Sequence, residues 1–139
     1  ELLRQDPGEA DGDAMLKVRG IDRALLEMIN EAARDSLPNE FVAMLRAEEG
    51  VIQELILLPG TLQGEDSATL MLHMMPVDFS IVGTVHSHPG YSNRPSREDL
   101  EFFRRYGYIH VITCLPFDEG SWRAYDGRGR RMQLPVVEL

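Results

Sequence analysis

The sequence predicts a single α/β domain built on a mixed β-sheet. Three observations favour this class: several apolar runs have the length of strands, two segments show the helical spacing of apolar residues, and turn residues separate these segments. The turn Glu48-Glu49-Gly50 joins two apolar runs as a hairpin, so part of the sheet is antiparallel. A chain of 139 residues is one domain by size and buries roughly two-thirds of the surface of its unfolded state.

The first elements follow a charged lead-in. Residues 1–14 carry five acids against one arginine, with turn-forming Pro and Gly, so we expect a flexible acidic segment there and a single domain over 15–139. Alternation of apolar and charged residues predicts a short strand at 16–19. Apolar residues with helical spacing predict a helix over about 22–36, and Pro38 ends it.

Two strands, 41–45 and 51–58, form the predicted hairpin. A polar loop and a further strand are expected at 62–67 and 68–74. His73 lies between apolar neighbours in that strand, which favours a strand-face role over a role as a metal ligand.

The second half of the chain continues the alternation of strand and helix. His110 falls in the middle of a predicted strand and is expected to be structural. The predicted elements are a strand at 80–87, a helix at 97–106, a strand at 108–115 and a terminal hairpin of 121–125 with 131–137.

Two histidines stand at the end of the strand 80–87. Because side chains two apart in a strand share a face, His86 and His88 can aim at one point. Pro-Gly and Arg-Pro steps then let the chain turn back, which brings Asp99 within reach from the first turn of the next helix. Two imidazoles and one carboxylate leave a fourth position for water, which is the ligand number of a catalytic zinc site.

A structural interpretation competes at each of these positions. A histidine in a strand is usually packed or hydrogen-bonded. Ser96 and Asp99 have the spacing of a capping box, with Ser at the N-cap and an acid at the third helical position. The two interpretations are partly compatible, because a cap of this kind also holds Asp99 in place.

The pattern His-x-His-x7-Ser-x-x-Asp resembles the signature of the JAMM/MPN+ zinc metalloproteases, which remove ubiquitin and ubiquitin-like modifiers from their targets. An upstream glutamate of that family lies in a Pro-x-Glu-Phe context, similar to residues 38–41 here. The resemblance covers about residues 15–139 and implies the MPN fold, a curved mixed β-sheet sandwiched by helices. The matching signature residues are His86, His88, Ser96 and Asp99.

The resemblance also implies roles for single residues. It implies one Zn2+ per chain with one bound water, held by His86, His88 and Asp99. It further implies that Glu40 is the general base and then the general acid, and that Ser96 donates a hydrogen bond to the developing oxyanion. Without the resemblance, Glu40 is an ordinary solvated residue at the start of a strand.

The substrate class implied is ubiquitin-like small modifier proteins with Gly-Gly tails and their conjugates, as for the compact prokaryotic members. Alternatives are a hydrolase of sulfur-carrier protein–amino acid adducts and a non-catalytic MPN scaffold. Tyr91 and Arg94, between the ligands, either contact an extended substrate tail or are ordinary loop residues. Residues 43–47, which follow Glu40, have bulky side chains, and the sequence does not determine the shape of the site wall that they form.

Bulk properties exclude several other classes. A net charge of −9 argues against nucleic-acid and anionic-membrane partners, and no apolar run approaches the ~20 residues that span a bilayer. The single cysteine, Cys114, lies in an apolar run and is expected to be a buried, inert thiol; it excludes an intrachain disulfide and the two-cysteine site of zinc deaminases. A cytoplasmic protein is the expectation, and whether it forms a homodimer stays open.

Overall fold

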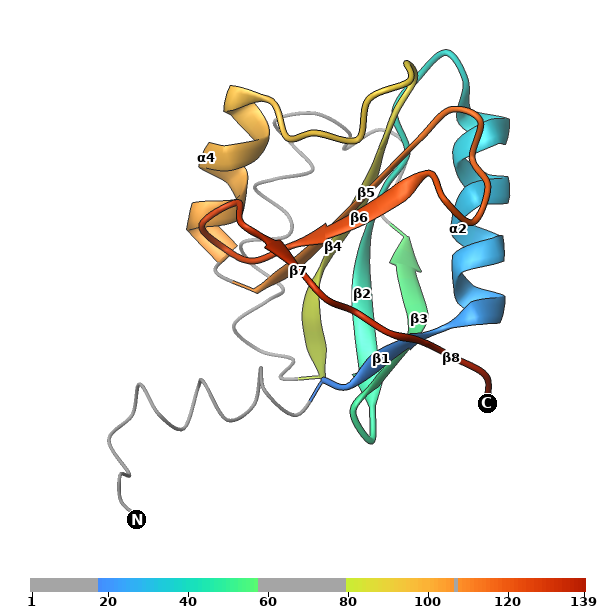
Figure 1. Cartoon of the computed structure of the whole chain (residues 1–139), viewed down its shortest axis with the longest axis vertical. Coiled ribbons are helices and arrows are strands. Elements are labelled where there is room, and N and C mark those ends of the chain that lie inside the picture. The colour runs from blue at the N-terminus through green and yellow to red at the C-terminus, as the bar shows by residue number, and fades with distance from the viewer. Residues whose placement is uncertain (1–17, 58–79, 107) are drawn as a thin grey trace.

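The computed structural model describes residues 18–57, 80–106 and 108–139, which form a mixed sheet of eight strands with a helix on each face (Figure 1). The strand order is β7-β6-β5-β4-β2-β3-β1-β8. The strands are β1 (Gly20–Asp22), β2 (Val42–Glu48), β3 (Val51–Leu57), β4 (Ile81–His88), β5 (Ile109–Cys114), β6 (Trp122–Tyr125), β7 (Arg131–Met132) and β8 (Val136–Val137), and the helices are α2 (Arg23–Ser36) and α4 (Arg97–Tyr106).

The sheet is strongly curved, because its two edge strands, β7 and β8, follow each other in the chain. Only residues 133–135 separate β7 from β8, and they span at most about 14 Å. A flat sheet of eight strands would place its edges roughly 34 Å apart, at about 4.8 Å per strand. The sheet therefore curls until its edges approach each other, and the buried Leu134 lies between them.

The β2–β3 hairpin forms where its turn residues predict it. Glu49 and Gly50 both adopt positive φ, 52° and 85°, as the two central residues of a tight hairpin turn do. Antiparallel pairing continues from β2 to β4, whereas β4 and β5 run parallel. The mixed sheet expected from the sequence is confirmed.

Helix α2 covers one face of the sheet. Its apolar side packs Leu25, Ile29 and Ala33 on Leu45 and Val111 from the strands, within a cluster of fully buried side chains. Asn30 on the same side accepts a hydrogen bond from Thr113 at 2.6 Å and donates one to the Asp118 carbonyl at 3.2 Å. The helix predicted over 22–36 is thus confirmed, one residue shorter at its start.

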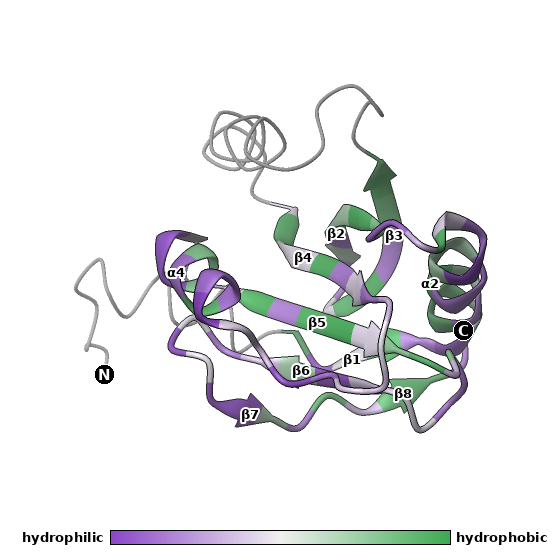
Figure 2. Cartoon of the chain, turned by 90° about the horizontal axis from the view of Figure 1, so that it is seen from above, coloured by the Kyte–Doolittle hydropathy of each residue, from purple (hydrophilic) through white to green (hydrophobic). Residues whose placement is uncertain are grey.

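Helix α4 covers the opposite face and confirms the prediction over 97–106. Phe103 is fully buried and packs with Ile112 and Tyr125. Its ring stacks on His110 with centroids 4.2 Å apart. Figure 2 shows the apolar interior of the sheet between polar outer surfaces of the two helices.

Two strand predictions differ from the structure. The first strand begins at Gly20, not within 16–19: residues 18 and 19 are not in a strand, and 16 and 17 lie outside the described residues. Gly20 passes so close to the Pro135 carbonyl oxygen that a Cβ would lie 2.8 Å from it. A residue without a side chain is therefore favoured where β1 begins to pair with its neighbouring strands. The segment 131–137 is not one arm of a hairpin: it divides into β7, which pairs with β6, and β8, which pairs with β1.

Other predictions lie outside the described residues. These are the acidic segment 1–14, the loop 62–67, the strand 68–74 and His73. Within the described residues, no helix is long and apolar enough to cross a membrane.

Candidate metal centre

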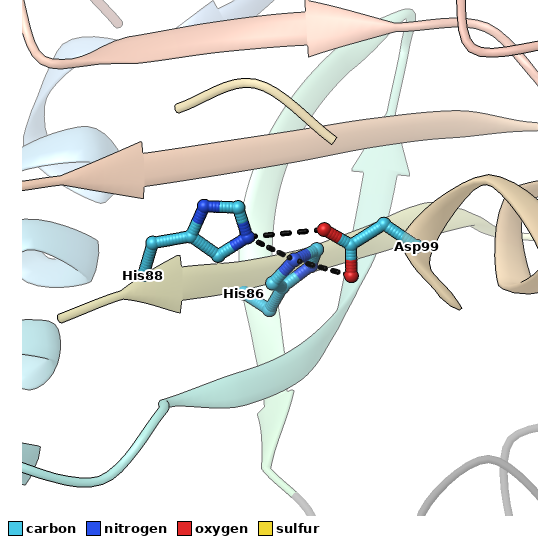
Figure 3. A group of neighbouring side chains, drawn as sticks. All are labelled: His86, His88 and Asp99. Carbon is cyan, nitrogen blue, oxygen red and sulfur yellow. Dashed lines mark hydrogen bonds and ion pairs between the residues drawn. The ribbon is translucent and has the colours of Figure 1, made fainter. Parts of the chain in front are cut away.

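The proposed ligands come together from β4 and α4 (Figure 3). Nε2 of His86 lies 3.2 Å from Nε2 of His88. The two carboxylate oxygens of Asp99 divide between them: Oδ1 lies 3.2 Å from Nε2 of His86, and Oδ2 lies 3.0 Å from Nε2 of His88. Pairing of His86 with Ile112 in β5 keeps this end of β4 inside the sheet, so both imidazoles start from a rigid backbone.

Asp99 is held by the capping box that the sequence predicts. The backbone N–H of Asp99 donates to Oγ of Ser96 at 3.0 Å, and the backbone N–H of Ser96 donates to Oδ2 of Asp99 at 2.9 Å. The structural and functional interpretations of these residues therefore hold together, since the cap fixes the carboxylate at the two imidazoles.

The tautomer of His88 is set by the loop before α4. Its Nδ1 lies 2.8 Å from the Ser92 carbonyl, so Nδ1 carries the proton and donates it. In the neutral ring, Nε2 is then a bare lone pair facing Asp99 and His86. Such a hydrogen bond on the far nitrogen is the usual partner of a metal-binding imidazole.

The loop is itself anchored to the edge of the sheet. The hydroxyl of Tyr125 donates to the Asn93 carbonyl at 2.8 Å, and the Asn93 side chain donates to the Ser121 carbonyl at 3.0 Å. The backbone N–H of Leu115 donates to the Gly90 carbonyl at 2.9 Å. These bonds fix the residues on both sides of Ser92, whose carbonyl orients His88.

Hydrogen bonds between Asp99 and the two histidines dominate the electrostatics of the candidate metal centre. Burial alone raises the pKa of Asp99, but hydrogen bonds to His86 and His88 reverse this effect and hold that pKa well below its usual range. The hydrogen bond to Asp99 raises the pKa of His88 above its usual value; burial opposes the rise, while the Ser92 carbonyl and the charge of Glu40 add to it.

The donor set fits a zinc ion. Zinc in proteins is tetrahedral, with nitrogen and oxygen ligands at about 2.0–2.2 Å, so two of its ligand atoms are about 3.3 Å apart. The two imidazole Nε2 atoms are 3.2 Å apart, and one ligand atom from each of the three residues lies within 4.8 Å of the others. A metal ion between the two imidazole nitrogens and the carboxylate would accept a lone pair from each of the three residues.

Glu40 stands two residues before β2, at the end of the ladder that pairs β2 with β4. In the β2–β4 ladder Val42 pairs with His86, and the Ser87 N–H donates to the Phe41 carbonyl at 2.9 Å, which continues the register beyond the end of β2. Continued by one residue, this register places Glu40 directly opposite His88. Glu40 is exposed, and its charge is near enough to raise the pKa of His88.

Four other residues singled out in the sequence have simple positions. His110 is fully buried in the core, where its Nδ1 lies 2.7 Å from the hydroxyl of Thr84. Cys114 is buried, and burial raises the pKa of its thiol, as expected for an inert cysteine. Tyr91 is 80% exposed and Arg94 is exposed, both on the loop beside the ligands.

Sequence reasoning missed Tyr125 and the carbonyl of Ser92. Tyr125 is 32 residues from Asn93 and reaches it only through the pairing of β5 with β6. No local pattern marks a tyrosine in a terminal strand as a support for a loop. A backbone carbonyl that orients an imidazole carries no residue-type signal at all.

A family model described as prokaryotic homologs of the JAB domain matches residues 22–126. The chain is 34% identical over 132 residues to a protein of Haloferax volcanii named "Probable metalloprotease", with 88% of this chain and 81% of that protein covered.

Solved structures agree with this match. A JAB1/MPN domain protein of Archaeoglobus fulgidus superposes with a TM-score of 0.71 at 43% identity, covering 86% of this chain and 99% of its own. A structure described as JAMM, a metalloprotease-like zinc site in the proteasome and signalosome, gives a TM-score of 0.70 at 41% identity and covers 87% and 99%.

Proposed function

Because the chain belongs to the prokaryotic JAB-domain family of JAMM-type metalloproteases, we propose that it is a zinc-dependent peptidase that releases ubiquitin-like small modifier proteins from their conjugates. The observation that carries the proposal is the convergence of His86, His88 and Asp99 on one point, with Glu40 directly across the ladder. Peptide and isopeptide bonds are chemically alike, so the same site serves both.

His86, His88 and Asp99 would hold the zinc ion, which would supply a Lewis acid and lower the pKa of a water molecule towards ~7. Glu40 stands two residues before β2 and is exposed, so in the proposed reaction it takes a proton from the attacking water. The same carboxyl group then gives this proton to the departing amine nitrogen.

Ser96 is suited to the oxyanion role in addition to its cap. Its Oγ accepts the Asp99 N–H, and no described group accepts the hydroxyl proton. A serine hydroxyl has one donor beside its acceptor lone pairs. Because Ser96 is exposed at the first turn of α4, this donor is free for a carbonyl oxygen of the substrate.

The two alternative functions differ in whether the metal centre performs hydrolysis. A hydrolase of sulfur-carrier protein–amino acid adducts uses the same centre on another acyl group. A non-catalytic MPN scaffold needs neither Glu40 nor three free ligands, and the retention of all five site residues speaks against it.

The decisive experiment is cleavage of a linear fusion and an isopeptide conjugate of a Gly-Gly-tailed ubiquitin-like protein. We expect cleavage after the second glycine that stops with a chelator and returns with Zn2+. A sulfur-carrier protein adduct tested in parallel separates the two hydrolase functions. Zinc-loaded protein that cleaves none of these substrates contradicts the proposal.

Glu40→Gln separates catalysis from metal binding. The amide cannot accept the proton, so turnover is expected to fall by at least about 100-fold, as general-base removal does, while zinc content stays at the natural level. Exposed Glu54 on β3 provides the matched control, Glu54→Gln, which keeps turnover. Near-natural turnover in Glu40→Gln means that another group is the base.

A further inference from the structure

Arginines from three separate segments meet beside the candidate metal centre. Arg123 and Tyr125 are two apart on β6 and so share the face that carries α4, and Arg131 on β7 is the direct cross-strand partner of Tyr125. Arg94 follows Asn93, whose carbonyl accepts the Tyr125 hydroxyl. We name Arg94, Arg123 and Arg131 the arginine cluster; its members converge on one tyrosine from β6, β7 and the loop before α4.

The electrostatics of Tyr125 agree with this geometry. Burial raises the pKa of Tyr125, and the guanidinium groups of Arg131, Arg123 and Arg94 each oppose that rise. A cation lowers the pKa of a neighbouring hydroxyl only from close range. Each of the three guanidinium groups is therefore near enough to Tyr125 to act on its pKa, in agreement with the strand register of Arg123 and Arg131 and with the hydrogen bond beside Arg94.

The charge of the cluster is not neutralised within the chain. Among the described residues, no carboxylate forms an ion pair with any of its three members. The nearby Asp126 is already engaged, because it accepts hydrogen bonds from the Arg130 side chain at 3.2 Å and from the N–H groups of Arg128 and Arg130. Arg94 and Arg131 are exposed, on a chain whose net charge is −9.

The cluster lies within the area that a bound protein substrate covers. His86 pairs with Ile112, which pairs with Arg123, so two strand spacings of about 4.8 Å separate the backbone of the centre from that of the cluster. Figure 2 shows the β6–β7 hairpin running beside α4. A standard protein interface buries about 800 Å² on each partner, which extends well beyond 10 Å from its middle.

We propose that the arginine cluster is a docking surface for an acidic face or acidic segment of the protein substrate. This inference rests on the proposed function for the existence of that substrate. Unpaired guanidinium groups bind carboxylates in pairs of hydrogen bonds. Complementary charge also orients the partner during encounter, and the cluster offsets the repulsion that an acidic enzyme exerts on an acidic partner.

A nucleic acid is the less favoured partner. Binding to a phosphate backbone uses a continuous basic patch or stripe on a basic domain. Here three arginines stand on a chain with 23 acidic against 14 basic residues. The cluster therefore matches a local group of carboxylates better than an extended polyanion.

The test uses the zinc-loaded full chain and a short fluorescent peptide rich in glutamate, which contains no Gly-Gly bond to cleave. A matched peptide with glutamine in place of glutamate is the reference. We expect binding of the glutamate peptide only, weakened about five- to tenfold by Arg94→Gln/Arg131→Gln and also by high salt. The control Arg19→Gln/Arg23→Gln changes the net charge equally, away from the cluster, and is expected to stay within about twofold.

Several results overturn the inference: equal binding of the two peptides, no effect of Arg94→Gln/Arg131→Gln, or tighter binding of a single-stranded oligonucleotide of equal length. Because the peptide is not cleaved, the result does not depend on hydrolysis. A chain that binds the acidic peptide through the cluster but cleaves no conjugate rejects the proposed function alone. A chain that cleaves conjugates with unchanged KM in Arg94→Gln/Arg131→Gln rejects the docking surface alone.

Discussion

The hydroxyl of Ser96 serves a helix cap and, in the proposed reaction, the oxyanion. Its oxygen accepts the Asp99 N–H, while the contact that returns to Asp99 comes from the Ser96 backbone. The two halves of the capping box therefore respond differently to mutation. Removing the side chain leaves the backbone donor on the Asp99 carboxylate in place.

Ser96→Ala is expected to lower kcat by about 100- to 1,000-fold, since loss of one oxyanion donor costs about 2.7–4 kcal/mol. Stability should fall by only about 1 kcal/mol from the lost cap, and zinc should remain bound. Steady-state kinetics, metal analysis and thermal unfolding measure the three effects. Ser92→Ala in the same loop is the control, and turnover equal to that of the natural chain excludes the role of Ser96.

Tyr125→Phe tests whether the tyrosine supports the metal centre from a distance. Loss of its hydrogen bond to the Asn93 carbonyl frees the loop that orients His88. We expect zinc affinity to fall about tenfold, as for other groups that orient a ligand, measured by competition with a chelating indicator. Tyr91→Phe, on an exposed side chain, should bind zinc normally; unchanged affinity in Tyr125→Phe contradicts the support role.

At the scale of elements, strand β4 contributes most to the candidate metal centre. It carries both histidines and is held from both sides, antiparallel by β2 and parallel by β5. Helix α4 brings Asp99 to these histidines, and in the proposed reaction the segment before β2 supplies Glu40. The three candidate ligands therefore come from one strand and one helix, and the packing of β4 decides how well they are placed.

Gly83→Ala should disrupt this packing. A Cβ at Gly83 would overlap the carbonyl oxygen of Ile109, a backbone atom that cannot move aside without separating β4 from β5. We expect a loss of about 3 kcal/mol in the free energy of unfolding, together with weaker zinc binding. Gly90→Ala is the control, because no atom lies within 4 Å of its added Cβ; denaturant unfolding compares the two variants.

At the scale of the whole molecule, His110 makes the stability of the fold depend on pH. Burial lowers the pKa of His110 to about 3, with a further contribution from His86, against an ordinary value of 6.5; the Phe103 carbonyl and Asp126 oppose the shift in part. Because the folded state binds this proton less well than the unfolded state, His110 stabilises the fold fully above pH 6.5. That contribution is lost as the pH falls from 6.5 towards 3.

For this one group, we expect a loss of about 2 kcal/mol in the free energy of unfolding between pH 7 and pH 5. The measurement is denaturant unfolding of zinc-free protein, which removes the pH dependence of metal binding. His110→Phe keeps a ring of similar size next to Phe103, but this ring cannot titrate. Between pH 7 and pH 5 the free energy of unfolding of His110→Phe should therefore fall by about 2 kcal/mol less than that of the natural chain. Parallel pH profiles for the two chains exclude His110 as the source.

The local sequence determined most elements and the grouping of His86, His88 and Asp99. Helical spacing defined α2 and α4, turn chemistry defined the β2–β3 hairpin, and the period of two in a strand placed His86 and His88 on one face. The capping box was also readable, since its partners are three residues apart. These features depend on contacts between residues that are close in the chain.

Tertiary structure alone decided the features that depend on strand order. The division of 131–137 between opposite edges, the start of β1 at Gly20 and the anchoring of the loop by Tyr125 follow from how the sheet curls. The pairing of Val42 with His86, which points the register towards Glu40, and the position of Arg94 near Tyr125 have the same origin. Apart from the pairing of β7 with β6, each joins residues more than thirty positions apart, and the spacing of residues within one segment carries no information on which distant strand becomes its neighbour.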